Sequence, residues 1–206
     1  MEIDPSYPGK EEYRVAAHTL ERVLSVLNQT FIETPGDFQQ RGLTRAPEVF
    51  LGYLMLDALI GNTDRHHENW GVLRSEGSPR RAVLAPSFDH ASSLGRNLAD
   101  EERLGRLETR DAGYRVPVFV RRARSPFYAA TEHKRRLAPL EVFQEACKKL
   151  PRASEYWLAI ARTVDRGLLK APLDRVPDAV MTQVARRFAQ AMVAANLDNV
   201  TMTTSP

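Results

Sequence analysis

Apolar positions recur along this chain mainly at helical spacing. Between Glu11 and Leu27 they return at steps of three and four residues, and the stretch 34–42 supplies the Pro, Gly and Asp that end the segment. Segments with the same spacing fill the second half of the chain, and several open on Pro or Asp, which suit a helix start. They cover residues 98–107, 139–150, 154–164 and 177–197. The pattern predicts a mainly α-helical protein.

One segment differs because it is apolar almost all round. The sequence EVFLGYLMLDALIG, residues 48–61, predicts a helix at the centre of the core. Thr44 is its candidate N-cap, Pro47 suits the first turn, and Gly61 ends it. Asp57 interrupts the apolar run, which also falls short of the roughly 18–20 residues that a membrane span requires. No transmembrane helix is therefore predicted.

Two short apolar segments after this helix have the pattern of a β-hairpin. Residues 70–73 and 82–85 flank a turn rich in Ser, Gly and Pro. If the two segments pair as an antiparallel hairpin around this turn, any two residues that face each other have sequence numbers whose sum is about 155. Asn69 then faces Pro86, and Asp89 follows about three residues later. We therefore expect Asn69 and Asp89 at the open end of one hairpin.

Between the buried helix and the hairpin lies the polar run NTDRHHEN, residues 62–69. Loops held by rigid elements at both ends are where catalytic groups collect. Phosphoryl transfer needs a carboxylate that orients the attacking hydroxyl and accepts its proton, and oxygen ligands that hold Mg²⁺ against the nucleotide phosphates. Asp64 can do the first, while Asn69 and Asp89 can do the second. Asp and Asn also cap turns, which is the alternative for each residue taken singly.

Two stretches carry a family resemblance. LIGNTDRHHENWGVL at 59–73 and LAPSFDHASSLG at 84–95 resemble the catalytic centre of the HipA-like serine/threonine kinases. This bacterial family is related to the protein-kinase fold and is often encoded as toxins beside a DNA-binding antitoxin. The D-R-H-x-x-N part also resembles the catalytic loop of phosphatidylinositol 3-kinase-like enzymes. The match is close over residues 45–95 and only general over the helical remainder.

The resemblance implies a role for each of four residues. Asp64 would be the catalytic base, Asn69 and Asp89 would bind magnesium, and His66 would lie against the nucleotide phosphates. The implied cofactors are ATP and Mg²⁺, and the implied reaction is transfer to a Ser or Thr hydroxyl, on a protein substrate or on the chain itself. The implied fold is mainly α with a small β-hairpin, a protein-kinase-like C-lobe.

The chain departs from a whole kinase ahead of this centre. The 63 residues before Asp64 contain neither G-x-G-x-x-G nor G-x-x-x-x-G-K-[ST], and Lys10 is their one lysine. We therefore expect the nucleotide-binding N-lobe to be missing. The chain is then a fragment, a truncated gene product, or a half that a separately encoded N-lobe completes. A DNA-binding, antitoxin-like protein is the other expected partner. The expected organisation is a helix and linker at 1–45, a lobe at 46–200 and a disordered tail at 201–206. Within the lobe lie a catalytic loop at 61–70 and a metal-binding segment at 84–90.

Composition leaves other function classes weaker. Cys147 stands alone, which excludes disulfides within the chain and predicts a small buried hydrophobe. Adjacent His66 and His67 lack the spacing of a zinc site. The net charge of +3 and the basic clusters at 121–124 and 133–136 leave nucleic-acid binding as a weaker hypothesis. The acidic N-terminus lacks the features of a secretory signal, which indicates a cytoplasmic protein. A non-catalytic module for partner binding or regulation is the alternative to the kinase.

Overall fold

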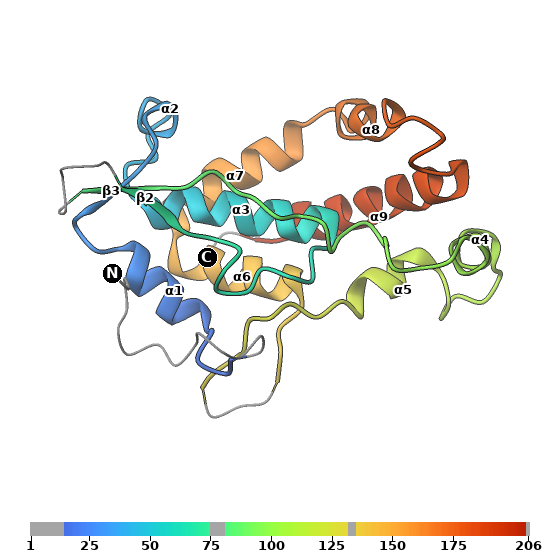
Figure 1. Ribbon diagram of the computed structural model, residues 1–206, viewed down its shortest axis with the longest axis horizontal. Coiled ribbons are helices and arrows are strands. Elements are labelled where there is room, and N and C mark those ends of the chain that lie inside the picture. The colour runs from blue at the N-terminus through green and yellow to red at the C-terminus, as the bar shows by residue number, and fades with distance from the viewer. Residues whose placement is uncertain (1–14, 75–80, 132–134, 205–206) are drawn as a thin grey trace.

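The computed structural model describes residues 15–74, 81–131 and 135–204, and within them the chain is mainly helical with one small sheet (Figure 1). The prediction of a mainly α protein with a small β-hairpin is confirmed. The helices are α1 (Leu20–Leu27), α2 (Gly36–Gln39), α3 (Ala46–Ile60), α4 (Asp100–Glu108), α5 (Val116–Arg121), α6 (Pro139–Lys149), α7 (Pro151–Thr163), α8 (Arg166–Asp174) and α9 (Gln183–Thr201). The strands are β1 (Ile32–Glu33), β2 (Val72–Arg74) and β3 (Ala82–Leu84).

Helix α3 is the centre of the core, as its apolar sequence predicts. It packs against α6, α7 and α9, so side chains on nearly every face of the helix are buried (Figure 1). Cys147 of α6 is buried in the same core, where burial raises the pKa of its thiol to about 12. The thiol therefore stays protonated and acts as a small hydrophobe, as predicted. No helix in the described ranges is long and apolar enough to cross a membrane.

The two ends of α3 are fixed by different devices. The N-cap is Arg45 and not Thr44, because the Glu48 carboxylate accepts hydrogen bonds from the backbone N–H groups of both residues, at 3.0 and 2.9 Å. The predicted end is confirmed: Gly61 adopts the left-handed conformation with φ of 64°. That conformation is one that glycine adopts without steric cost, so the chain leaves the helix sharply at this point.

Gly52 in the middle of α3 gives the first testable prediction. A Cβ atom at this position would lie 2.3 Å from the ring of Trp157, whose Nε1 donates a hydrogen bond of 2.8 Å to the Glu48 carbonyl. We expect Gly52→Ala to lower the free energy of unfolding by about 1–3 kcal/mol, because the clash outweighs the gain in helix propensity. Urea denaturation measures the change. Gly36→Ala is the control, since a Cβ there meets nothing within 4 Å. A Gly52→Ala variant as stable as the wild type would contradict the prediction.

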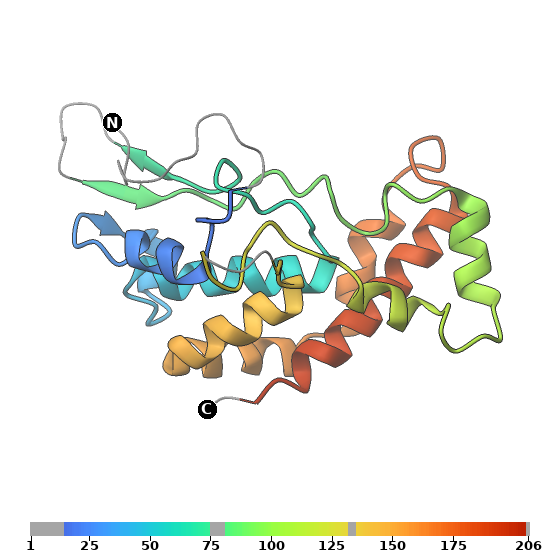
Figure 2. The same ribbon diagram turned by 90° about the horizontal axis from the view of Figure 1, so that it is seen from below.

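The hairpin is formed by β2 and β3, and β1 adds a parallel strand on the far side of β3 (Figure 2). Val72 pairs with Leu84, which is one position from the predicted register. The Tyr53 hydroxyl of α3 donates a hydrogen bond of 3.0 Å to the Ala85 carbonyl and so ties the hairpin to the central helix. β1 was not predicted, because two residues are too few to show alternation.

Some helix boundaries differ from the sequence pattern. α1 begins at Leu20, after Thr19, whose Oγ1 accepts a hydrogen bond of 3.3 Å from the Arg22 N–H. The part of the predicted segment before residue 15 lies outside the described residues. α9 begins at Gln183 and not at 177, because Thr182 caps it in the same way. Among the described residues, the pattern missed three helices, α2, α5 and α8.

The described part of the predicted tail, residues 201–204, continues from α9. Thr203 is buried, and its carbonyl accepts a hydrogen bond of 3.0 Å from the Arg162 guanidinium of α7. This part of the tail is therefore attached to the helical core, in contrast to the predicted disorder.

Candidate active site

The polar run after α3 lies beside a segment that comes about thirty residues later in the sequence. The Thr63 N–H donates to the Ser92 carbonyl at 3.0 Å, and the Leu94 N–H donates to the Ile60 carbonyl at 2.9 Å. These two hydrogen bonds hold residues 60–63 against residues 92–94 at the end of α3. The predicted catalytic loop and the segment after the hairpin therefore form one structural unit.

A buried ion pair lies beneath this unit. Arg65 is 1% exposed, and its guanidinium binds the Asp57 carboxylate of α3 through two hydrogen bonds of 2.8 Å. The Asn62 side chain donates a third hydrogen bond, of 2.9 Å, to the same carboxylate. A buried carboxylate is costly unless it is paired and hydrogen-bonded, and Asp57 meets both conditions.

The same guanidinium reaches the backbone on both sides of the hairpin. Its Nη1 donates to the Asn69 carbonyl and, at 3.2 Å, to the Phe88 carbonyl. Its Nη2 donates to the Ser87 hydroxyl at 2.9 Å. Because Asp89 directly follows Phe88, one side chain brings together the chain segments that carry both predicted magnesium ligands. Arg65 was not singled out from the sequence; the signal that could have revealed it is Asp57, a lone charge in an apolar helix.

Asp64 is held with its carboxylate partly open to solvent. The side chain is 18% exposed, and its Oδ2 accepts a hydrogen bond of 3.3 Å from the Ser92 hydroxyl. The Asp64 N–H donates to the Asn62 side chain at 3.0 Å, and its carbonyl accepts from the Asn69 amide at 2.6 Å. Backbone and side chain are both fixed, as a positioned proton acceptor requires.

Asn69 is buried and oriented by that same hydrogen bond. Since the amide nitrogen donates to the Asp64 carbonyl, the amide oxygen points away from it. In the described part of the chain no donor reaches this oxygen, so it can serve as a metal ligand.

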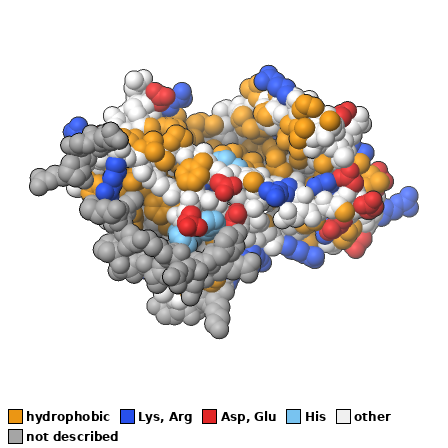
Figure 3. Space-filling view, viewed as in Figure 1, with side chains coloured by type: hydrophobic (Ala, Val, Ile, Leu, Met, Phe, Trp, Pro, Cys, Tyr) orange, Lys and Arg blue, Asp and Glu red, His pale blue; other side chains and the backbone are white. Residues whose placement is uncertain are grey.

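Asp89 has an unusual backbone conformation. Its φ is +50°, a region that residues other than glycine rarely adopt, although Asp tolerates it better than most. The residue is exposed, and no hydrogen bond or ion pair joins its carboxylate to another described residue. Figure 3 shows acidic side chains gathered beside histidine on the face of the molecule that it draws. The carboxylate is therefore available to a cation.

His66 lies next to Asp64 but is largely buried. Its Nε2 is 4.0 Å from Asp64 Oδ1, and its Nδ1 accepts a hydrogen bond of 3.2 Å from the Glu68 N–H. The ring is followed by those of His67 and His18, with centroids 5.7 and then 6.4 Å apart. Burial lowers the pKa of His18 to about 3, so this ring is neutral at neutral pH. Contact of His66 with nucleotide phosphates stays a prediction.

The donor set at this site suits magnesium. Mg²⁺ is commonly bound by one or two protein oxygens, with waters and phosphates completing an octahedron, and Asn69 with Asp89 supply two. Within the described ranges, no three or more His, Cys, Asp or Glu side chains are arranged so that they could hold a metal ion by themselves.

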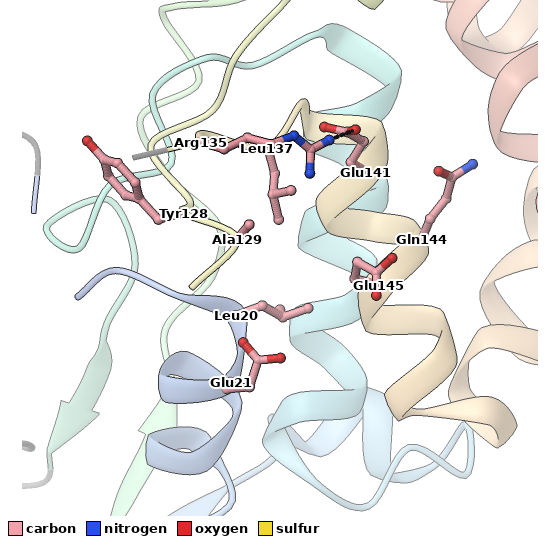
Figure 4. A pocket seen from close by; sticks show the side chains of 9 residues that line it. All are labelled: Leu20, Glu21, Tyr128, Ala129, Arg135, Leu137, Glu141, Gln144 and Glu145. Carbon is pink, nitrogen blue, oxygen red and sulfur yellow. Dashed lines mark hydrogen bonds and ion pairs between the residues drawn. The ribbon is translucent and has the colours of Figure 1, made fainter. Parts of the chain in front are cut away.

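A hollow between α1 and α6, away from the candidate site, is also lined by acidic side chains (Figure 4). Three glutamates line it, and each is paired with a cation. The pairs are Glu21 with Lys149, Glu141 with Arg135, and Glu145 with Lys148. Its negative charge is therefore neutralised within the protein, unlike that of Asp89.

Comparisons with known proteins indicate which fold the chain has. No protein-family model matches the sequence, and no curated protein matches it. Among solved structures, the chain is similar to a Helicobacter pylori proinflammatory kinase, CtkA, with a TM-score of 0.63 and 20% sequence identity. The similarity covers 97% of this chain and 67% of that chain. The protein therefore has a kinase-like fold.

Proposed function

We propose that this chain is the catalytic lobe of a kinase that transfers a phosphoryl group from ATP to a serine or threonine hydroxyl, with Mg²⁺. The observation that carries the proposal is the buried Arg65 guanidinium, which bonds to the carbonyls of Asn69 and Phe88 together. It brings the two candidate metal ligands to the loop that holds Asp64. The kinase-like fold supports the same reaction class.

Each group has a distinct role in this proposal. The Asp64 carboxylate orients the acceptor hydroxyl and takes its proton as the phosphoryl group arrives. The Asn69 amide oxygen and the Asp89 carboxylate would hold Mg²⁺, which when bound neutralises charge on the phosphate oxygens. His66 lies beside Asp64, where we propose that it faces the nucleotide phosphates. A phosphoryl acceptor on a protein substrate or on the chain itself fits these roles.

The partners and the location belong to the same proposal. A separately encoded nucleotide-covering lobe is one proposed partner, because the residues before Asp64 contain neither G-x-G-x-x-G nor G-x-x-x-x-G-K-[ST]. The HipA-like pattern in residues 59–73 favours a DNA-binding, antitoxin-like regulator as the other. The cytoplasm is the proposed location, since ATP, the proposed phosphoryl donor, is present there. If the chain binds partners without catalysis, it is a kinase-like regulatory module instead.

Transfer of labelled γ-phosphate from ATP tests the proposal. We expect transfer to a mixed Ser/Thr protein substrate with Mg²⁺ and none with EDTA, for the chain alone or with the product of the reading frame directly upstream. Mg-ATP at one hundred times its dissociation constant should stabilise the fold by about 2.7 kcal/mol, seen as a higher Tm.

Matched aspartates supply the control. Asp89→Asn should remove most of the magnesium-dependent rise in Tm, because the site loses its charged ligand. Asp111→Asn should change nothing, since Asp111 is exposed and, among the described residues, its carboxylate accepts a hydrogen bond only from the Gly113 N–H. Absence of both transfer and any rise in Tm would leave the regulatory module as the better account.

A further inference from the structure

A cavity of about 220 Å³ opens beside the candidate active site, between the segment after the hairpin, α5 and α9. Its lining mixes hydroxyls and two arginines with an apolar floor. Among the residues that line it are Thr63, Ser92, Arg96, Phe119, Arg122 and Met192. Neither the sequence pattern nor the proposed phosphoryl transfer accounts for this cavity.

The cavity begins one side chain away from the candidate base. Ser92 lines the cavity and its hydroxyl donates to the Asp64 carboxylate at 3.3 Å. Thr63 precedes Asp64 in the chain and also lines the cavity, and its hydroxyl donates to the Ser92 carbonyl at 3.1 Å. A chain seated in the cavity therefore passes within reach of Asp64.

The size of the cavity favours an occupant smaller than a nucleotide. Pockets for small-molecule ligands measure about 300–1,000 Å³, and this one is smaller. It is still several times the roughly 30 Å³ that one water occupies in the liquid. One amino-acid side chain with its backbone is the occupant of matching size.

The charge of the rim selects the kind of side chain. Arg96 and Arg122 are exposed, and within the described ranges neither forms an ion pair. The neighbouring Arg103 and Arg106 are instead paired with Asp100 and Glu102. The rim thus offers two cations without acidic partners above an apolar floor. A glutamate fits both features, because its aliphatic stem is apolar and its head is anionic.

We propose that this cavity binds an acidic residue, glutamate above all, that flanks the acceptor serine or threonine of a protein substrate. The proposal rests on the proposed phosphoryl transfer and adds the substrate class. With the glutamate between Arg96 and Arg122, the adjoining hydroxyl comes to Asp64 in place of the Ser92 hydroxyl. The two arginines also offset the repulsion between an acidic substrate and the carboxylates of the site.

Serine peptides that carry Glu, Gln or Lys at the positions flanking the acceptor test this proposal. For the wild type we expect kcat/KM for the Glu peptide to exceed that for the Lys peptide by about tenfold, the effect of two exposed charge pairs. Arg96→Glu combined with Arg122→Glu should reverse the order. Arg124→Glu is the control, because Arg124 is an exposed arginine of the same cluster that does not line the cavity. Raising the salt concentration should weaken the preference.

The possible outcomes distinguish a failure of this proposal from a failure of the proposed phosphoryl transfer on which it rests. Transfer without a charge preference, or a preference that survives the double substitution, overturns the cavity assignment and leaves the kinase function standing. If no peptide is phosphorylated, fluorescence anisotropy of the labelled Glu and Lys peptides decides. Tighter binding of the Glu peptide that the double variant loses supports the cavity without the kinase, and equal or absent binding overturns it.

Discussion

Arg65→Met is expected to lower the free energy of unfolding by about 3–5 kcal/mol, the usual cost of leaving a buried charge without its partner. Among the described residues, the Asp57 carboxylate would keep a hydrogen bond from the Asn62 amide and the His90 ring 3.9 Å away, beneath the candidate active-site loop. The Asn69 and Phe88 carbonyls would lose a shared donor as well. Urea denaturation measures the loss, and a change below about 1 kcal/mol would contradict the assignment.

A double substitution distinguishes the ion pair from simple packing. Asp57→Leu together with Arg65→Met removes both charges, and we expect it to recover much of the stability, since replacing a buried pair by apolar residues is often neutral. Phosphoryl transfer should not recover with the stability, because the Asn69 and Phe88 carbonyls still lack the hydrogen bonds that Arg65 donates to them. Arg65→Lys should fall between, since an ammonium group cannot form the two-pronged contact with Asp57.

Asp64→Asn is expected to reduce phosphoryl transfer by about 10²–10⁴-fold, the usual contribution of a positioned general base. Asparagine keeps the size of aspartate and can still accept the Ser92 hydrogen bond through its oxygen. The rise in Tm with Mg-ATP should therefore persist, because the proposed metal ligands are Asn69 and Asp89. Labelled-phosphate transfer and thermal unfolding on the same preparation measure the two effects.

Two outcomes would argue against the role of Asp64 as base. The first is a wild-type rate in the Asn variant. The second is a loss of activity that follows a loss of folding, which circular dichroism of the variant detects. Ser92→Ala offers a comparison, since it removes the hydroxyl that bonds to Asp64 Oδ2 but leaves the carboxylate in place. Its effect on transfer should be smaller than that of Asp64→Asn.

The sequence alone predicts those parts of this fold that depend on local pattern. The all-round apolar character of α3 and the glycine at its end are visible in the sequence, as is the hairpin with its register to within one residue. The sequence also allowed Asp64, Asn69 and Asp89 to be selected as candidate site residues. Their order and residue types match the base and metal ligands that phosphoryl transfer requires. Their chemical roles remain predictions.

Other parts depend on contacts between distant residues. The Arg65 guanidinium bonds to Asp57, eight positions earlier in the sequence, and to Phe88, twenty-three positions later. A local sequence pattern cannot reveal partners at such separations. Helix α5, six residues long, is too short to show helical spacing, yet it brings Arg122 to the cavity. The left-handed backbone of Asp89 is likewise a product of tertiary structure, since an aspartate at that position does not favour it by itself.

The two backbone hydrogen bonds that join residues 60–63 to 92–94 have a consequence for substrate positioning. Both stretches line the cavity, and residues 60–63 lead directly into the candidate base. The spacing between them is therefore fixed when the chain folds, before any substrate arrives. A substrate anchored at the cavity is therefore held relative to two stretches of chain that are already fixed. The entropy of ordering these stretches is lost once, when the protein folds, and not again in every catalytic cycle.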